Sequence, residues 1–302
     1  MATEYLGIDI GGTNVKMGIV DSETGNIKNF YSHETSSWRA SGRFVERLGD
    51  AIVLQLKENP EVKKVGIGVP GLISRDRNTL IEITAIPETN GIHIIPVLKE
   101  RFPEHDFFLE NDANAAALGE YYFGEEKLPE DYIFVTLGTG VGGAAIIDKL
   151  VFKGGGGNAM EPGHMPSENG KVLERIIGKN ELLDMANKMR GAFVGETRLP
   201  ADGTISTTGL VAAASEGDEL ALKIFDRVGA LLGDGLVSMI RILDITTVLI
   251  GGGLSASFEY IIPAVNRQLQ YWLTPYYTKT LDIRRATLAN DAGLLGAASL
   301  CF

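Results

Sequence analysis

Leu6-Gly7-Ile8-Asp9-Ile10-Gly11-Gly12-Thr13-Asn14 and Ile133-Phe134-Val135-Thr136-Leu137-Gly138-Thr139-Gly140-Val141 are two copies of one pattern, an apolar β-type run that ends in a glycine-rich turn. A second β-type run leaves each turn, over 15–20 and 143–147, so each copy predicts a β-hairpin. Glycines permit close backbone approach and direct N–H groups toward an anion. Taken singly, each turn is typical of a structural hairpin connection. The repeat favours a ligand, a polyphosphate, held between duplicated halves.

The overall composition indicates a globular chain with more acidic than basic residues. Its 302 residues are 44% hydrophobic, which is enough for two domains with large cores. The 28 basic residues against 39 acidic ones give a net charge of −11, without a Lys/Arg cluster. This balance disfavours binding to nucleic acid or to an anionic membrane surface. A phosphate ligand must therefore be held by local geometry, with glycine N–H groups, a few lysines and a divalent cation.

Targeting and redox signals are few. Met1 leads directly into a strand without a basic start and a long apolar run, so we expect no secretory signal and a cytoplasmic location. The most apolar later region, 231–254, is interrupted by charged residues and predicts a core helix and a core strand rather than a membrane span. The single cysteine, Cys301, excludes an intramolecular disulfide and a multi-cysteine zinc cluster.

The rest of the chain predicts strands, helices and irregular segments. We expect a domain boundary near residues 112–116, with an N-terminal lobe over 1–114, a C-terminal lobe over 115–289, and 290–302 returning to the first lobe. Pro87–Pro96 and the four glycines at 154–157 are expected to be irregular. The predicted strands cover 62–69, 107–109 and 247–249, and the predicted helices cover 42–56, 97–102, 113–123, 173–189, 218–240, 258–273 and 291–300.

Two common nucleotide-binding motifs do not fit. Gly66–Gly71 and Gly138–Gly143 match G-x-G-x-x-G, but the dinucleotide fingerprint needs a helix directly after the glycines. Here the first match leads into a loop and the second into a strand. The chain lacks G-x-x-x-x-G-K-[ST], which excludes a P-loop mechanism.

Acidic and amide side chains form a second candidate set. Asp112 lies where a strand meets an alanine-rich helix, so it is a helix N-cap, a general base for phosphoryl transfer, or both. Glu161-Pro162-Gly163-His164, together with Glu174 and Asn111, suits a polyhydroxylated ligand. An isolated histidine is more often structural, and His164 lacks the partner spacing of a metal site.

The assembled motifs resemble the ROK family (repressor, open reading frame, kinase), in particular its sugar kinases, over nearly the whole chain. Asp9–Lys16 resembles the D-x-G-G-T-x-x-K phosphate segment, Gly68–Gly71 the G-x-P-G turn, and Glu110–Ala116 the catalytic segment. Gly138–Gly143 resembles the second phosphate loop, and Glu161–His164 the E-x-G-H sugar motif. Gly251-Gly252-Gly253 resembles the adenosine-side turn.

This resemblance implies an α/β, two-lobed actin-like ATPase (ribonuclease-H-like) fold with duplicated β-hairpin/α units and an active site in the cleft between the lobes. It implies ATP and Mg²⁺, with Asp112 taking the proton of a sugar hydroxyl, usually that on C6. The sugar-side residues implied are Asn111, Glu161, His164, Glu174 and Gly71. The residues implied for ATP are Asp9 (near Mg²⁺), Gly11, Gly12, Thr13, Lys16, Gly138, Thr139, Gly140, Gly252 and Gly253.

The chain departs from the family pattern beside the sugar motif. The family commonly has a C-x-C-G-x-x-G-C zinc segment there, whereas Met165–Leu173 contains no cysteine, so we expect no structural zinc. Met160 stands where the family usually has glycine, and 87–96 lacks the usual tryptophan. The identity of the sugar is therefore left open by the sequence.

Three hypotheses follow. The first is an ATP-dependent hexose kinase, with glucose preferred over mannose, fructose or an N-acetylhexosamine. The second is a sugar-responsive regulator, although the acidic chain begins at the first hairpin and shows no DNA-binding segment or basic face. The third is a pseudo-kinase that binds sugar without turnover. A homodimer is implied by the resemblance; Tyr271, Trp272, Tyr276 and Tyr277 are candidates for an interface, but we favour core or cleft packing for them.

Overall fold

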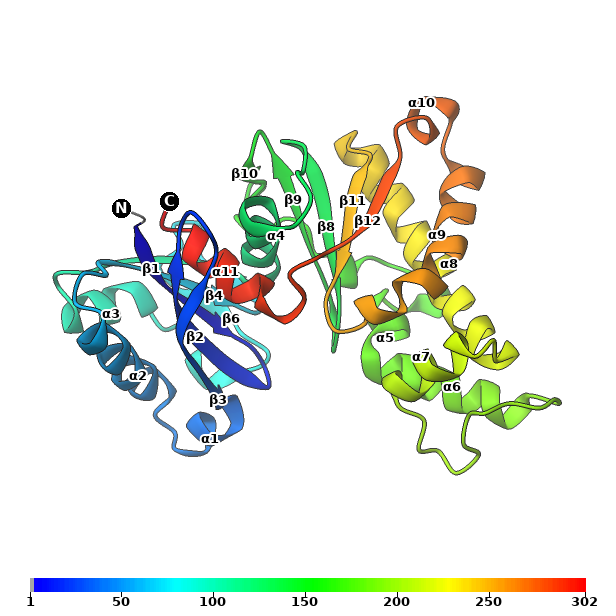
Figure 1. Cartoon of the computed structure of the whole chain (residues 1–302), viewed down its shortest axis with the longest axis horizontal. Helices are drawn as coiled ribbons and strands as arrows, with labels where there is room; N and C mark the ends of the chain where they lie inside the picture. The colour runs from blue at the N-terminus through cyan, green and yellow to red at the C-terminus, as the bar shows by residue number, and fades with distance from the viewer. Residues whose placement is uncertain (1–2) are drawn as a thin grey trace. The chain divides into compact units, whose positions relative to one another are not determined.

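The computed structural model describes residues 3–302, which form two compact units (Figure 1). Unit 1 comprises the chain up to Leu128 together with Ala144–Met160 and Asn290–Phe302, and unit 2 comprises Pro129–Gly143 and Glu161–Ala289. The expected boundary at 114/115 falls inside a helix of unit 1, α4 (Asp112–Phe123).

Unit 1 is built around a five-stranded sheet in the order β3-β2-β1-β4-β7. The strands β1, β2 and β3 form an antiparallel meander, and β1, β4 and β7 are parallel. The strand β4 is buried almost throughout, as expected for a central parallel strand. The elements of unit 1 are β1 (Glu4–Ile10), β2 (Asn14–Asp21), β3 (Ile27–Glu34), α1 (Thr35–Ala40), α2 (Phe44–Glu58), β4 (Lys64–Val69), β5 (Leu72–Ile73), β6 (Leu80–Glu82), η1 (Pro87–Thr89), α3 (Ile94–Arg101), β7 (Asp106–Asn111), α4, β10 (Leu150–Val151) and α11 (Ala292–Ser299).

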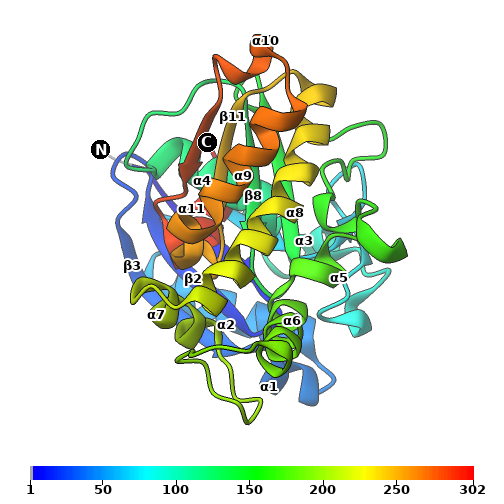
Figure 2. The same ribbon diagram turned by 90° about the vertical axis from the view of Figure 1, so that its right-hand side faces the viewer.

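Unit 2 carries three strands of the second sheet, β8, β11 and β12, and most of the long helices. The two longest helices of unit 2, α8 and α9, pack side by side (Figure 2). The amphipathic helix α8 buries one face that includes Phe225 and Leu232, which anchors it in the core. The elements of unit 2 are β8 (Tyr132–Leu137), η2 (Pro162–His164), η3 (Glu168–Gly170), α5 (Glu174–Ile177), α6 (Lys179–Ala192), α7 (Thr207–Ser215), α8 (Glu219–Leu243), β11 (Thr247–Gly251), η4 (Ser255–Ser257), α9 (Phe258–Trp272), α10 (Pro275–Thr278) and β12 (Asp282–Arg285).

The second sheet repeats the topology of the first. Its order is β10-β9-β8-β11-β12, with β8, β11 and β12 parallel and β10 antiparallel to β9. The strand β9 (Val141–Ile147) contains the division between the units, which falls after Gly143. Each sheet thus begins with a glycine-turn hairpin, β1-β2 or β8-β9, as the repeated sequence pattern predicts.

Helix α11 is packed unusually close to its neighbours in unit 1. It lies against β1, β4 and α4 (Figure 1). Glycines occupy the points of contact. A Cβ at Gly7 would lie 2.4 Å from the carbonyl oxygen of Leu294, and a Cβ at Gly66 would lie 1.7 Å from that of Ala297. A Cβ at Gly296 would lie 1.7 Å from the carbonyl oxygen of Ala115 on α4. Backbone-to-backbone contact therefore fixes α11 between the sheet and α4.

Several sequence predictions differ from the structure in detail. The predicted helix over 173–189 is two helices, α5 and α6, which are separated at Gly178; a Cβ there would approach the carbonyl oxygens of Glu174 and Thr139. The segment Pro87–Pro96, expected to be irregular, contains η1 and the first turn of α3. For the aromatic group at 271–277 the prediction was core or cleft packing. The core part was wrong, because Tyr271, Trp272 and Tyr276 are 76%, 53% and 68% exposed.

Within residues 3–302, none of the helices combines the length and the apolar character needed to cross a membrane. Even α8, the longest at 25 residues, carries charged side chains along its exposed face.

The packing of α11 predicts a large effect of one methyl group. Gly66→Ala would force the added Cβ into the Ala297 carbonyl, so we expect a loss of about 3 kcal/mol of unfolding free energy or more. Urea denaturation followed by circular dichroism measures this loss. Gly191→Ala is the matched control: it lies in α6 with open space around its Cα, and helix propensity predicts an unchanged or slightly higher stability. Equal stability of the two variants would contradict the backbone-contact model.

Candidate functional site

The first glycine turn, Gly11–Asn14, is held in shape by backbone and side-chain bonds within unit 1. The amide of Gly11 donates to the carbonyl oxygen of Asn14 at 2.8 Å. Thr35, the first residue of α1, donates its hydroxyl to the carbonyl oxygen of Gly11 at 2.7 Å and its amide to that of Thr13 at 2.9 Å. Sequence reasoning did not select Thr35; its one signal was a threonine at the start of a helix that directly follows a strand.

Asp9 and Lys16 lie on either side of this turn. They are register partners in the β1-β2 hairpin, and the Lys16 Nζ lies 3.9 Å from Asp9 Oδ2. Lys16 also donates to the carbonyl oxygen of Asn290 at 2.7 Å. The side chain of Asp9 is only 18% exposed, and this burial raises its pKa, an effect that the charge of Lys16 partly offsets. Gly293 of α11 leaves room for the carboxylate, because a Cβ there would lie 2.8 Å from Asp9 Cγ.

The turn between β7 and α4 carries Asn111 and Asp112. The Asn111 side chain caps α4, accepting from the amides of Ala113 at 2.9 Å and Asn114 at 3.2 Å. The N-cap role considered for Asp112 thus belongs to Asn111, while Asp112 is the first residue of the helix and its Oδ1 accepts from the amide of Ala113. Asn111 Nδ2 also donates to the carbonyl oxygen of Gly71 at 3.2 Å, which brings two of the expected sugar-side residues together.

The second glycine turn, within unit 2, is fixed by its own bonds and by neighbouring segments. The Gly138 amide donates to the carbonyl oxygen of Gly140, and the Gly138 carbonyl accepts from the amide of Lys179 at the start of α6. Within residues 3–302, the amides of Thr139 and Gly140 have no protein acceptor. These two N–H groups are therefore the ones available for an anion.

Glu174 lies directly against this second turn. Its Oε2 accepts from the Val141 amide at 3.0 Å, and a Cβ at Gly140 would lie 2.3 Å from the same oxygen. The E-x-G-H glutamate, Glu161, is partly buried; burial chiefly raises its pKa, the negative charge of Glu174 adds to the rise, and His164 opposes it. The charges of His164 and Glu174 thus both act on Glu161. Glu174 also accepts a hydrogen bond from the second turn.

A pocket of about 240 Å³ lies beside the third glycine turn of unit 2. Gly253 and Leu254 form one side, and apolar side chains of α6, α7 and α8, among them Leu182 and Phe225, line most of the rest. Gly252 has a positive φ of 86°, and a Cβ there would meet the Leu137 carbonyl at the end of β8. The pocket is mostly apolar and carries the hydroxyl-bearing residues Thr207 and Thr208, which suits a flat heterocycle with a few polar edges. Sequence reasoning missed α7, which supplies part of this wall.

The model of the ROK family matches residues 5–302. The chain belongs to the ROK family. A glucokinase of Thermotoga maritima is 29% identical to it over 98% of this chain and 96% of that protein. The crystal structure of a candidate sugar kinase from Cytophaga hutchinsonii is 41% identical, covers 99% of both chains and superposes with a TM-score of 0.94.

Two further similar proteins have different named functions. A ROK glucokinase from Streptomyces griseus, crystallised with glucose and AMPPNP, is 28% identical over 98% of both chains, with a TM-score of 0.78. A xylose repressor of Caldicellulosiruptor bescii is 25% identical over 85% of this chain and 68% of its own length. The likeness to ROK sugar kinase structures confirms the expected α/β, actin-like fold class.

The chain departs from the usual ROK pattern in the segment between His164 and Glu174 and at Met160, and the structure describes the backbone at both places. Between His164 and Glu174, Pro166 and Val172 form an isolated β-bridge and Leu173 donates its amide to the Met165 carbonyl. In the part of the chain that the structure describes, no group of three or more His, Cys, Asp or Glu residues is placed to hold a metal ion. Met160 has a φ of 68°, the left-handed region that favours the glycine usual in the family.

The buried position of Asp9 predicts that it costs stability. Its raised pKa means that the native state binds this proton more tightly than the unfolded chain, so stability falls as pH rises from the ordinary pKa of 3.8 through the raised value. Asp9→Asn removes this loss, so its advantage over wild type should grow with pH across that window and then level off. Each unit of pKa rise corresponds to about 1.4 kcal/mol.

Urea unfolding between pH 4 and pH 8 measures this difference. Asp50→Asn is the control, and its effect on stability should have the opposite sign. A hydrogen bond from Arg101 lowers the pKa of exposed Asp50, so the ionised carboxylate stabilises the fold above about pH 4 and Asp50→Asn should lose that stability. An Asp9→Asn protein that is less stable than wild type at pH 7 would refute the burial argument.

Proposed function

We propose that this protein is an ATP-dependent sugar kinase that phosphorylates a hexose, with glucose as the first choice and C6 as the position. The observation that carries the proposal is the Asn111–Asp112 turn: Asn111 caps α4 and bonds Gly71, so the carboxylate of Asp112 is not needed as the cap. A carboxylate at such a position suits a general base for a sugar hydroxyl. Membership of the ROK family and the similarity to glucokinases support the same conclusion.

The phosphate chain of ATP is assigned to the two glycine turns. In unit 1, Gly11, Gly12 and Thr13 lie in a turn that is kept rigid by Thr35, with Lys16 adding a positive charge beside it. In unit 2, the amides of Thr139 and Gly140 are available donors. We assign the adenosine to the mostly apolar pocket beside Gly252 and Gly253.

Mg²⁺ fits the oxygen donors of unit 1. Asp9 offers a mostly buried carboxylate beside the first turn, and Mg²⁺ is commonly bound by one or two carboxylates together with substrate phosphates. When bound, Mg²⁺ neutralises charge on the phosphates during transfer. The charge of Lys16, whose Nζ lies 3.9 Å from Asp9 Oδ2, acts in the same direction.

The sugar is assigned to Asn111, Gly71, Glu161, His164 and Glu174. Carboxylates, an imidazole and an amide can each bond ring hydroxyls, which fixes the sugar in one orientation. Asp112 then accepts the proton of the attacking hydroxyl as that oxygen bonds the γ-phosphorus and ADP leaves. The proposed base belongs to unit 1, and Glu161, His164 and Glu174 belong to unit 2.

Further parts of the proposal concern the setting of the enzyme. We place it in the cytoplasm, where ATP and hexoses meet, and we expect a homodimer, which sedimentation velocity tests. A regulator without turnover is the second candidate, because the ROK family includes repressors. The acidic charge of the chain, −11, argues against a DNA-binding surface on it.

The test is a coupled assay of ADP release with Mg-ATP against a panel of hexoses and N-acetylhexosamines. Asp112→Asn should lower kcat by about 10²- to 10⁴-fold while sugar binding, measured by calorimetry, changes little, because the base acts chiefly in the transition state. Asp50→Asn, an exposed aspartate on α2, is the control and should keep the wild-type rate. Phosphorus NMR of the product identifies the phosphorylated position.

Each outcome decides between the candidates. A hexose-dependent rate that Asp112→Asn removes would establish the kinase and name its sugar. Sugar binding without turnover would favour the regulator or the pseudo-kinase. An Asp112→Asn variant with normal turnover would overturn the assignment of the base.

A further inference from the structure

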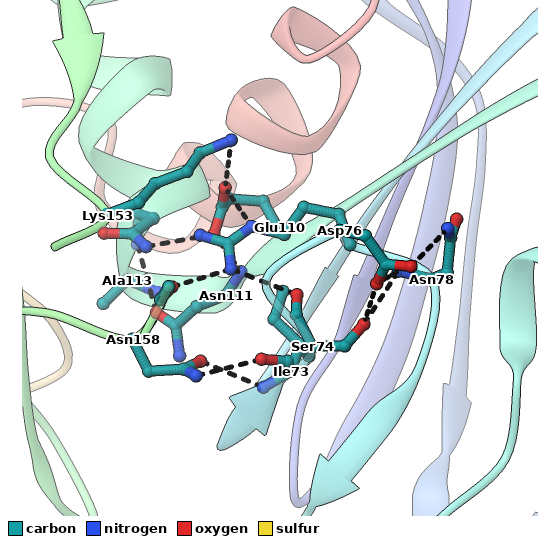
Figure 3. Close-up of polar contacts among 12 residues, drawn as sticks. Ile73, Ser74, Asp76, Asn78, Glu110, Asn111, Ala113, Lys153 and Asn158 are labelled. Carbon is teal, nitrogen blue, oxygen red and sulfur yellow. Dashed lines mark hydrogen bonds and ion pairs between the residues drawn. The ribbon is translucent and has the colours of Figure 1, made fainter. Parts of the chain in front are cut away.

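Glu110, the residue before the Asn111–Asp112 turn, is a carboxylate buried inside unit 1. Its side chain is only 3% exposed. Its Oε1 accepts from the backbone amide of Asn111 at 2.9 Å and from Asn114 Nδ2 at 3.0 Å. One carboxylate oxygen thus holds both the residue that caps α4 and the first turn of that helix (Figure 3).

The other oxygen of Glu110 is held by Arg77, from the connection between β5 and β6. Arg77 Nε donates to Glu110 Oε2 at 3.0 Å, and the arginine side chain is 10% exposed. Arg77 Nη1 donates to the carbonyl oxygen of Gly157 at 2.7 Å. The guanidinium of Arg77 therefore joins the Asp112 turn to the glycine run at 154–157, and Gly157 lies eighty residues after Arg77.

Asn158 provides a second attachment of the glycine run. Its Nδ2 donates to the carbonyl oxygen of Ile73 at 2.9 Å, and its Oδ1 accepts from the amide of Ile73 at 3.0 Å (Figure 3). The amide side chain thereby bonds both backbone groups of a residue in β5. Because Met160 is the last residue of this segment in unit 1, the attachment lies just before the chain enters unit 2 at Glu161.

Stability alone does not explain this arrangement. A buried ion pair is often no more stabilising than apolar side chains of the same volume. Arg77 Nη2 is also buried and, within residues 3–302, has no hydrogen-bond partner, which costs further stability. Lys153 Nζ is a weaker second cation, at 3.7 Å from Glu110 Oε2 and 47% exposed. What the pair does provide is fixed geometry for three segments distant in sequence.

We propose that Arg77 and Glu110 are positioning residues, which hold Asn111 and Asp112 in the geometry needed for proton abstraction and fasten the glycine run to the same turn. This inference rests on the proposed kinase function. Neither residue touches the substrate in this proposal; they act through the Asn111 amide and the first turn of α4. Small displacements of a catalytic group cost as much as about 100-fold in rate.

The experiment compares four variants: Arg77→Met, Arg77→Lys, Glu110→Gln and the double variant Arg77→Met/Glu110→Gln. We expect Arg77→Met to lower kcat about 10- to 100-fold with little change in the KM for ATP, since the residues assigned to ATP lie elsewhere. Arg77→Lys should recover part of the rate, because an ammonium can pair with Glu110 but lacks the fork that also reaches Gly157. The double variant should lose less than the product of the two single losses, since no unpaired buried charge remains.

Arg101→Met is the matched control. Arg101 belongs to the same unit and pairs with Asp50 at 2.7 Å, but its side chain is 40% exposed and bonds no expected site residue. It should keep the wild-type kcat. An Arg77→Met protein that is folded and retains kcat within twofold of wild type would overturn the proposal. The proposal would also be overturned if the kcat of Arg77→Lys were no higher than that of Arg77→Met.

Hydrogen exchange separates this proposal from the kinase proposal, because it needs no substrate. Peptides covering 108–116 and 154–160 should exchange faster in Arg77→Met than in Arg101→Met, with other peptides of unit 1 unchanged. If the wild-type protein phosphorylates no sugar, the kinase proposal fails while the exchange data still decide the positioning role. Unchanged exchange in both peptides would overturn that role whatever the activity.

Discussion

The close contact of α11 with the first sheet and with α4 is the constraint on which unit 1 depends. Gly7 and Gly66 allow the helix to touch the sheet, and Gly296 allows it to touch α4, so each contact is between backbones. Side chains can change rotamer to relieve a clash, but backbones in regular elements cannot, which leaves α11 with one position. That position places Gly293 against Asp9. It also fixes α4, the helix that begins at Asp112.

The site carries buried charge that folding alone does not favour. Burial raises the pKa of Asp9 and of Glu161, which means that the ionised forms are held in the native state at a cost. Glu110 is more deeply buried and is paired with Arg77. Such groups are typical of sites where preorganised charge acts on a ligand. Burial of apolar side chains around β1 and β4 offsets this unfavourable free energy; Leu6, Ile8 and Ile67 are fully buried there.

Local patterns in the sequence predicted the two hairpins, α2, α4, α8, α9 and α11, because each has a strong periodic or glycine signal of its own. The division of 173–189 at Gly178 was missed, since one of the two carbonyls that leave no room for a Cβ there belongs to Thr139, a residue distant in the chain. The structural roles of Thr35, Arg77 and Asn158 were missed for the same reason. Their partners lie 24, 33 and 85 residues away, and a pattern within a short window carries no information about them. The roles assigned to Asp112, Glu161 and His164 remain predictions, which rest on motif order.

The chain passes between the two compact units four times, after Leu128, Gly143, Met160 and Ala289. Unit 1 therefore needs the last thirteen residues of the sequence, Asn290–Phe302, before its core is complete. During synthesis the face of the first sheet that α11 covers must stay exposed until residues 290–302 have been made. We therefore expect an N-terminal fragment that ends before α11 to be partly folded, with apolar strands exposed to chaperones and proteases.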